Sequence, residues 1–172
     1  KNMRKTTLFR QLIDSPEILL LPGVHDVLSA RIGAGAGFKA MTGGGFSASA
    51  TLLGKPDTSQ LSVTEMTNHY ERICEVINLP FFGDGDTGFG NVTNISRTVR
   101  MYERAGLAGM FIEDQVFPKR CGHMVGKTVI PTEEMVSVLG GEGEADASGV
   151  AAEITPTPEE GPRGERAANG AT

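Results

Sequence analysis

Acidic residues alternate with glycines in the segment GDGDTG at residues 83–88, directly after the apolar residues LPFF. Side chains two positions apart on an extended chain point the same way, so Asp84 and Asp86 can share one ligand. A hard cation such as Mg²⁺ takes one or two carboxylates and keeps several waters. Glu113, at the end of the next apolar run, can hold one of those waters. The alternative is a cap for a helix starting near Asn91, but two acids among three glycines exceed what a cap needs, so a metal site is favoured.

The same segment matches the G-x-G-x-x-G pattern of dinucleotide-binding loops, which lie between a strand and a helix. A pyrophosphate needs bare backbone N–H groups there, whereas Asp84 and Asp86 bring negative charge into the loop. The acidic residue expected about 20 positions further on would be Glu103. It falls in the middle of an expected helix instead of at a strand end. The sequence therefore disfavours a nucleotide site.

A second segment that could carry chemistry is PKRCGHMVGK at residues 118–127. Cys121 stands among Lys119, Arg120 and His123, and neighbouring positive charge favours the reactive thiolate form. We expect an accessible thiol suited to a nucleophile or an acid–base group. Zinc is disfavoured, because Cys-x-His lacks a second close pair of ligands. On chemistry alone an incidental loop thiol is an equal alternative.

The other cysteine and two other histidines are expected to be structural. Cys74 follows Ile73 on an amphipathic pattern and is expected in the core. His25 is expected at a helix start and His69 on the surface. Two cysteines make no disulfide framework, so we expect reduced thiols and a cytoplasmic location.

Short apolar runs precede both segments and predict buried strands. The expected strands lie at residues 18–23, 39–45, 79–86 and 108–115, and the expected helices lie at 25–38, 62–77, 91–106 and from 131 onward. Ser62 and Glu65 form a capping box, and Gly106 marks a helix end. Alternating strands and helices predict parallel βαβ units, and both faces of such a sheet must be covered. The polar residues collect where strands end, which is where α/β folds, barrel or doubly wound, build their sites.

The bulk composition excludes several classes of protein. At 172 residues, 39% apolar and 22% charged, the chain is long enough for one domain with a real core. No apolar run approaches the roughly 20 residues of a membrane span, and the start of the chain lacks the apolar stretch of a signal peptide. Residues 1–136 hold 14 acids and 14 bases, and residues 137–172 hold 7 acids and 2 bases, which gives the net charge of −5. No basic face for nucleic acid is present.

The composition changes at about Ser137. Residues 137–172 contain no aromatic residue and are rich in Gly, Ala, Glu and Pro. Such a segment buries too little surface to offset its ordering entropy. We therefore expect a folded unit at residues 1–136 and a disordered segment at 137–172, either a natural tail or an out-of-frame translation.

Four blocks of this chain together resemble the isocitrate lyase and phosphoenolpyruvate mutase superfamily: LPGVHDVLSARI, LLGKPD, DGDTGFGN and IEDQVFPKRCGH. The resemblance covers residues 8–136. The KRCGH sequence is similar to the branch of methylisocitrate lyase and 2,3-dimethylmalate lyase, whereas the mutases and oxaloacetate decarboxylases lack this cysteine loop. The resemblance implies a (β/α)₈ TIM barrel, of which about four βα units are present here. It also implies a homo-oligomer, usually a tetramer with a swapped helix, and Mg²⁺-dependent cleavage of a carbon–carbon bond in a 2-hydroxy acid.

The resemblance also assigns roles to residues. Asp84 and Asp86 would hold Mg²⁺, or Mn²⁺ in its place, with Glu113 in the outer shell. Cys121 would protonate the departing enolate-like carboxylate, on a loop that closes over the substrate. The other groups expected to bind the small carboxylic acid substrate are Gly122 and the backbone N–H groups of Gly44, Gly45 and Phe46.

Two departures keep other hypotheses open. The segment TGGGFS at residues 42–47 lacks the Tyr and Ser that methylisocitrate lyases have there, and nothing after Val136 resembles the family. The first hypothesis is a lyase that releases pyruvate from an acid of the 2,3-dimethylmalate or 2-methylisocitrate type. The second is a non-catalytic chain, either a truncated product or a half-barrel that binds partners. The third is a decarboxylase or a phosphonopyruvate-type enzyme of the same superfamily. We expect the 172-residue chain by itself, with an unclosed barrel, to show no lyase turnover.

Overall fold

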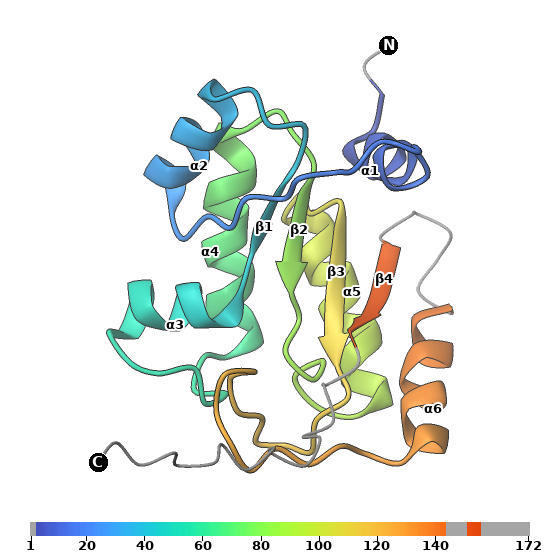
Figure 1. The fold of residues 1–172 in the computed structure, drawn as a ribbon. Helices are drawn as coiled ribbons and strands as arrows, with labels where there is room; N and C mark the ends of the chain where they lie inside the picture. Colours follow the sequence, from blue (N-terminus) through green and yellow to red (C-terminus); the bar gives the residue numbers. More distant parts are fainter. Residues whose placement is uncertain (1–2, 144–150, 156–172) are drawn as a thin grey trace, which may run out of the picture.

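The computed structural model describes residues 3–143 and 151–155. Its centre is a sheet of four parallel strands in the order β1-β2-β3-β4. All four run in one direction in Figure 1, so their carboxyl ends meet at the same edge of the sheet. The strands are β1 (Met41–Gly43), β2 (Phe81–Asp84), β3 (Gly109–Glu113) and β4 (Ala151–Thr155).

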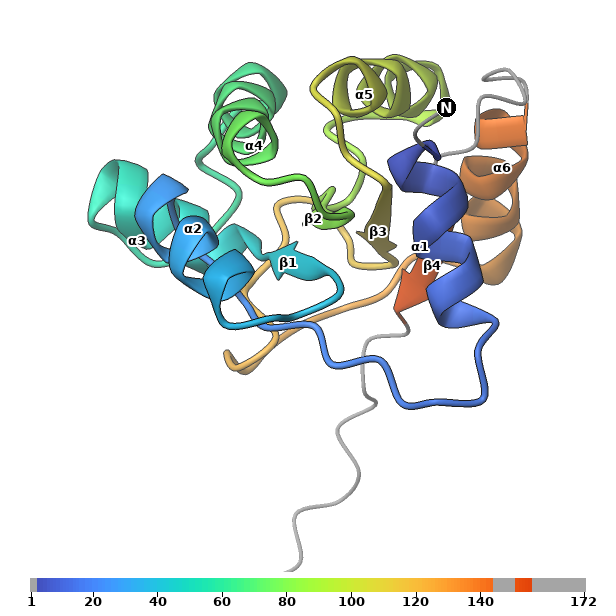
Figure 2. The same cartoon turned by 90° about the horizontal axis from the view of Figure 1, so that it is seen from above.

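Helices line the curved sheet, as Figure 2 shows from above. Three of them connect successive strands and pack beside one another, namely α4 (Val63–Val76), α5 (Val92–Arg104) and α6 (Thr132–Gly143). The others are α1 (Lys5–Ile13), α2 (Val27–Gly35) and α3 (Gly45–Leu53). The expected parallel βαβ architecture is confirmed. None of the helices in the described ranges is long and apolar enough to span a membrane.

The expected strand at residues 18–23 is wrong. This segment makes a single β-bridge, from Gly23 to Thr42. Pro22 has no N–H to donate and only accepts a hydrogen bond from the Thr42 backbone. Ile18 and Leu20 are 90% and 67% exposed. An apolar run had suggested a buried strand, but of its Ile and Leu side chains only Leu19 and Leu21 are partly buried, against the cluster that contains Phe9 and Phe82.

The expected helices are confirmed, although two further ones, α1 and α3, were not expected. Ser62 and Glu65 form the capping box of α4, and Gly106 follows the end of α5 with a positive φ of 92°. Cys74 is buried in the core as expected. His69 is only 7% exposed and packs on Tyr70, so the surface position expected for it is wrong.

Regular structure continues beyond residue 136. Helix α6 runs to Gly143, with Met135 and Val138 buried on its inner side. Strand β4 pairs with β3 over its full length, from Ala151 opposite Gly109. The boundary expected at residue 136 therefore falls inside a helix, because the average composition of the segment hid its short apolar stretches. The rest of the expected tail, residues 144–150 and 156–172, lies outside the described residues.

Candidate metal and active site

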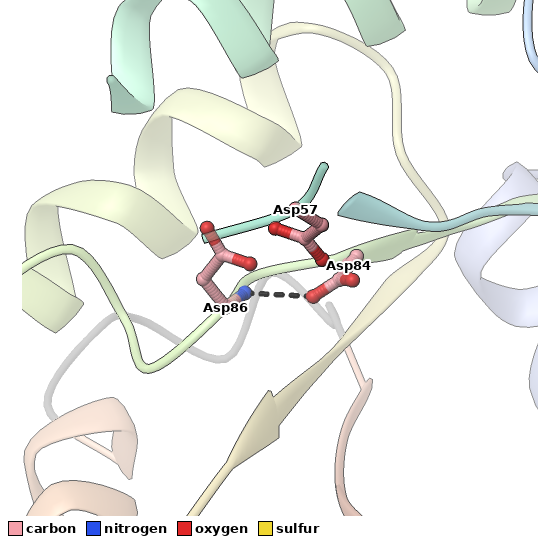
Figure 3. Close-up of side chains that lie close together, drawn as sticks. All are labelled: Asp57, Asp84 and Asp86. Carbon is pink, nitrogen blue, oxygen red and sulfur yellow. Dashed lines mark hydrogen bonds between the residues drawn. The ribbon is translucent and has the colours of Figure 1, made fainter. Parts of the chain in front are cut away.

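Three buried aspartates converge at the carboxyl end of β2, as Figure 3 shows. One carboxylate oxygen from each of Asp57, Asp84 and Asp86 lies within 4.8 Å of the others. Asp84 is the last residue of β2, and Asp86 follows with a left-handed φ of 50°. Asp57 arrives from the loop after α3 and is 3% exposed. The two sequence-predicted ligands do lie together, but Asp86 lies in the turn after β2, where an extended strand end was expected.

Glycine makes this convergence possible. A Cβ atom on Gly45 would come within 3.0–3.1 Å of carboxylate oxygens of all three aspartates. A Cβ on Gly85 would lie 2.3 Å from the Met110 side chain and 2.9 Å from the Phe111 carbonyl oxygen. Side chains at these positions would push the acids or the strands apart. The Gly-rich sequence therefore serves close approach of the backbone to the acid cluster.

Two buried tyrosines hold the end of β2 in place. The Tyr102 hydroxyl donates to the Asp84 carbonyl at 2.9 Å, and the Asp84 N–H donates to the Tyr70 hydroxyl at 3.2 Å. The Tyr70 hydroxyl in turn donates to the Gly43 carbonyl at 3.0 Å. Burial raises the pKa of both phenols well above their usual value, so both stay neutral.

Lys119 reaches the same cluster from the loop after β3. Its Nζ lies 2.6 Å from Asp86 Oδ1, 3.0 Å from Asp57 Oδ2 and 3.7 Å from Asp84 Oδ2. Glu113, the last residue of β3, adds a fourth carboxylate at 3.0 Å. Burial opposes the charge of Lys119, but Asp84, Asp86 and Glu113 together outweigh it and raise the pKa of its ammonium group. Lys119 is therefore cationic at any ordinary pH.

One buried cation does not fully compensate these acids. Burial is the largest cause that raises the pKa of Asp84, and burial followed by the charge of Asp84 raises the pKa of Asp86 to about 7. Asp86 Oδ1 pairs with Lys119 without hydrogen-bond geometry and accepts no hydrogen bond from the described residues. Crowded carboxylate oxygens, one of them without a hydrogen bond, are the donor set that Mg²⁺ prefers. The residues present fit a divalent cation.

Glu113 is also fixed from its other side. The Gln115 amide donates to Glu113 Oε2, and the same amide nitrogen donates to the Arg120 carbonyl at 2.9 Å. The Arg120 N–H donates back to Gln115 Oε1 at 3.1 Å. Gln115 thus ties the fourth carboxylate to the loop that carries Lys119.

The structure places Cys121 next to the acids but corrects its expected surroundings. Its N–H donates to the Asp57 carbonyl at 3.1 Å, and its Sγ lies 3.4 Å from His123 Nδ1. The thiol was expected to be accessible, yet Cys121 is only 8% exposed. Lys119 turns to the carboxylates, and Arg120 donates to the Val125 carbonyl. The charges next to Cys121 in the sequence are therefore mostly used elsewhere.

The expected substrate-binding backbone lies beside the cluster, at the start of α3. Gly44 is the N-cap of this helix, and the Gly45 N–H donates to Asp84 Oδ2 at 2.6 Å. Phe46 is 60% exposed. Gly122 is exposed in the loop that follows Cys121. One of the three N–H groups assigned to substrate is thus engaged by a carboxylate of the cluster.

A cavity of about 350 Å³ opens beside the acids. Asp86 is part of its wall. The other lining residues are Ser59, Gln60, Leu61, Ser62, Val63, Thr87, Phe89 and Phe117. The cavity provides room for a small molecule next to one proposed metal ligand.

Sequence reasoning missed two members of the cluster. Asp57 belongs to LLGKPD, a block that marks the family resemblance but received no role. Lys119 was considered only as a charge near Cys121. The signal for Asp57 was an acid in a Gly-Pro loop, and the signal for Lys119 was its place six residues after Glu113, the acid at the end of β3.

Fold and site together define a barrel-type α/β protein with an acidic centre at its strand ends. The family model of phosphoenolpyruvate phosphomutase matches residues 9–155, and the chain belongs to this family. The match extends past Val136, which corrects the expectation that nothing beyond that residue resembles the family.

Individual proteins of this superfamily are also similar to the chain. The chain is 43% identical to 2,3-dimethylmalate lyase of Eubacterium barkeri over 137 residues, which cover 80% of this chain and 47% of that protein. It is 48% identical over 132 residues to the chloroplastic carboxyvinyl-carboxyphosphonate phosphorylmutase of Arabidopsis thaliana, covering 76% and 39%. The structure of oxaloacetate acetylhydrolase in complex with 3,3-difluorooxalacetate superposes with a TM-score of 0.85 at 31% identity, covering 89% of this chain and 54% of the other. The chain thus spans about half the length of these relatives, as part of a (β/α)₈ barrel.

Proposed function

We propose that the protein is a Mg²⁺-dependent carbon–carbon lyase that cleaves a 2-hydroxy di- or tricarboxylic acid into pyruvate and a second carboxylate. The supporting observation is that the carboxylates and the Cys121 loop lie next to each other. A buried set of carboxylates lies at the strand ends, and the Cys121 loop is hydrogen-bonded to one of its members, Asp57. The similarity to named lyases such as 2,3-dimethylmalate lyase supports the same class of reaction.

Each group has a place in this reaction. Asp84 and Asp86 would hold Mg²⁺, or Mn²⁺, with Asp57 beside them and Glu113 in the outer shell. Bound there, the ion would stabilise negative charge on the 2-oxygen of the substrate. Amides at the start of α3 favour an anion, so they would orient the substrate carboxylate. Those amides belong to Gly44 and Phe46, whereas the Gly45 N–H donates to Asp84 Oδ2.

In the proposed cleavage the substrate loses one proton from its 2-hydroxyl and gains one proton at C3. The 2-hydroxyl would pass its proton to a water molecule as the C2–C3 bond breaks, and the C2 carbonyl of pyruvate would form. The electron pair of the broken bond passes to C3 of the second fragment, as its enolate-like carboxylate. The Cys121 thiol would deliver a proton to that carbon, and Gly122 would let its loop lie against the substrate. Burial of Cys121 keeps this proton transfer away from bulk water.

A second candidate keeps the site and changes the reaction to phosphorus–carbon chemistry or to decarboxylation. The specific observation in its favour is the 48% identity to a phosphorylmutase. Carbon–carbon cleavage and these alternative reactions would use the same acids. The nature of the bond that is cleaved separates the two.

We also propose a cytoplasmic location and a homo-oligomeric state. Two unpaired cysteines agree with a cytoplasmic location. Leu28 and Ile32, one turn apart on α2, are 66% and 65% exposed, which supports a homo-oligomer. The expected lack of turnover in the 172-residue chain by itself stays a prediction.

The test is pyruvate release by the protein expressed from its complete gene. The acids 2,3-dimethylmalate, 2-methylisocitrate and oxaloacetate are compared side by side, each with Mg²⁺ and with excess EDTA. The proposal expects pyruvate from a 2-hydroxy acid with Mg²⁺ and none with EDTA. Turnover of oxaloacetate alone would support the second candidate. Undiminished activity in EDTA would refute the metal assignment.

A further inference from the structure

Lys119 occupies the centre of the proposed metal site. It is 2% exposed, and its Nζ contacts carboxylates from three separate parts of the chain. Asp57 comes from the loop after α3, Asp86 from the turn after β2 and Glu113 from the end of β3. Hydrogen bonds to Asp57 Oδ2 and Glu113 Oε1, both at 3.0 Å, fix the ammonium group. A lysine held in this way is an internal counter-ion for the acids.

We propose that the Lys119 ammonium group and a divalent cation compete for the same place, so that metal binding drives Lys119 out of the acid cluster. The inference rests on the proposed metal site. Mg²⁺ bonds to carboxylate oxygens at about 2.1 Å and would need Asp86 Oδ1, the oxygen that Nζ approaches to 2.6 Å. An ion on these oxygens would lie in the space of Nζ, and the two positive charges would repel each other. The ion also brings twice the charge to the same carboxylates.

This exchange would reach the thiol through the loop. The backbone that follows the Cα of Lys119 is anchored to the site by two hydrogen bonds. Ser59 Oγ donates to the Lys119 carbonyl at 3.4 Å, and the Cys121 N–H donates to the Asp57 carbonyl at 3.1 Å. A lysine that leaves a place of 2% exposure has to move this backbone as well. Metal occupancy therefore sets the position of Cys121, and Lys119 is the residue that links the two.

The first test uses the unaltered protein and lysine acetylation by acetic anhydride, followed by peptide mass spectrometry. Lys119 is expected to be acetylated at least about tenfold faster with saturating Mg²⁺, because the ion releases a buried amine into solvent. Lys127 is the control, since it lies in the same loop and donates to the carbonyls of Gly122 and Met124 instead of to an acid. Its rate is expected to stay constant. A Lys119 rate that is unchanged or lowered by Mg²⁺ would overturn the exchange.

The second test measures Mn²⁺ and Mg²⁺ affinity by calorimetry in the unaltered protein, in Lys119→Met and in Lys127→Met. Removal of the competitor is expected to tighten binding at least about tenfold in Lys119→Met and to leave Lys127→Met unchanged. Equal or weaker binding in Lys119→Met, with ordinary binding in the unaltered protein, would refute the exchange and leave the proposed function standing. No binding in any of the three would refute the metal site itself, and the exchange with it.

Discussion

The two ends of the sheet differ in polarity: one is apolar and the other is charged. Where the strands begin, an apolar cluster packs under α1, with ring centroids of Phe9 and Phe82 5.3 Å apart. Where the strands end, four carboxylates surround one ammonium group. Both ends are buried, yet burial stabilises the first and costs several kcal/mol per unpaired ion at the second. The apolar end therefore stabilises the fold, whereas the acidic end carries an electrostatic cost that a bound cation can relieve.

Replacement of Asp84 should produce the largest effect at the charged end. Asp84→Asn keeps the shape of the side chain but removes the charge at the centre of the cluster. We expect loss of measurable Mg²⁺ binding, at least about 100-fold, together with loss of any lyase activity. Calorimetry provides the measurement, and Asp14→Asn, at an exposed helix end, is the control. Binding within about threefold of the unaltered protein would remove Asp84 from the ligand set.

Cys121→Ser should separate chemistry from binding. Loss of an acid–base group costs about 10²–10⁴-fold in rate. Mg²⁺ and pyruvate affinity should remain nearly intact, since the Asp57 contact of residue 121 uses its backbone. Steady-state kinetics and calorimetry on the protein from the complete gene give both numbers. A serine variant within about threefold of the original rate would exclude the acid role.

The apolar end should respond to substitution in the opposite manner. Phe82→Ala removes a ring packed on Phe9 and Phe111 and should lower the free energy of unfolding by about 3–5 kcal/mol. Metal affinity of the folded molecules should stay constant. Denaturant unfolding measures the loss, and Leu28→Ala, at a 66% exposed position, should change stability by less than about 0.5 kcal/mol. An equal loss in both variants would show that the cluster is not the stabilising end.

The smallest effect concerns pH. Burial and the charge of Asp84 raise the pKa of Asp86 to about 7, and only the ionised carboxylate binds a cation. Protons therefore compete with the metal below that value. Mg²⁺ affinity should fall by up to about tenfold for each unit of pH below 7 and change little above it. Calorimetry across this range is the check, and Asp86→Asn should weaken the dependence, while burial of Asp84 preserves part of it. An affinity that rises on acidification would contradict the assignment.

The sequence predicted local features of the site well and long-range ones poorly. Asp84 and Asp86 were found because two residues of separation place both acids at one strand end. Asp57 was missed because no periodicity links a loop acid to a later strand. Lys119 was assigned to its sequence neighbour Cys121, whereas its long side chain spans to the acids. Burial of Cys121 is likewise a tertiary property that composition does not report.

In the fold, too, local features were predicted from the sequence and long-range ones were not. The capping box at Ser62 and the pattern of α5 predicted helices correctly, because both signals lie within one turn or a few turns. The Gly-rich start of α3 concealed a helix whose later residues are good helix formers. Strand β4 was missed because its five residues are stabilised by pairing with β3, which neighbouring composition does not encode.

The central claim is that the carboxylates at the strand ends hold a divalent cation. Its most direct test is a crystal structure of the protein grown with Mn²⁺, in which anomalous scattering locates the ion without bias. We expect a peak about 2.0–2.3 Å from carboxylate oxygens of Asp84 or Asp86, and Lys119 Nζ displaced from its present contacts. A map with no peak at these oxygens, and with Lys119 still between Asp57 and Asp86, would contradict the account.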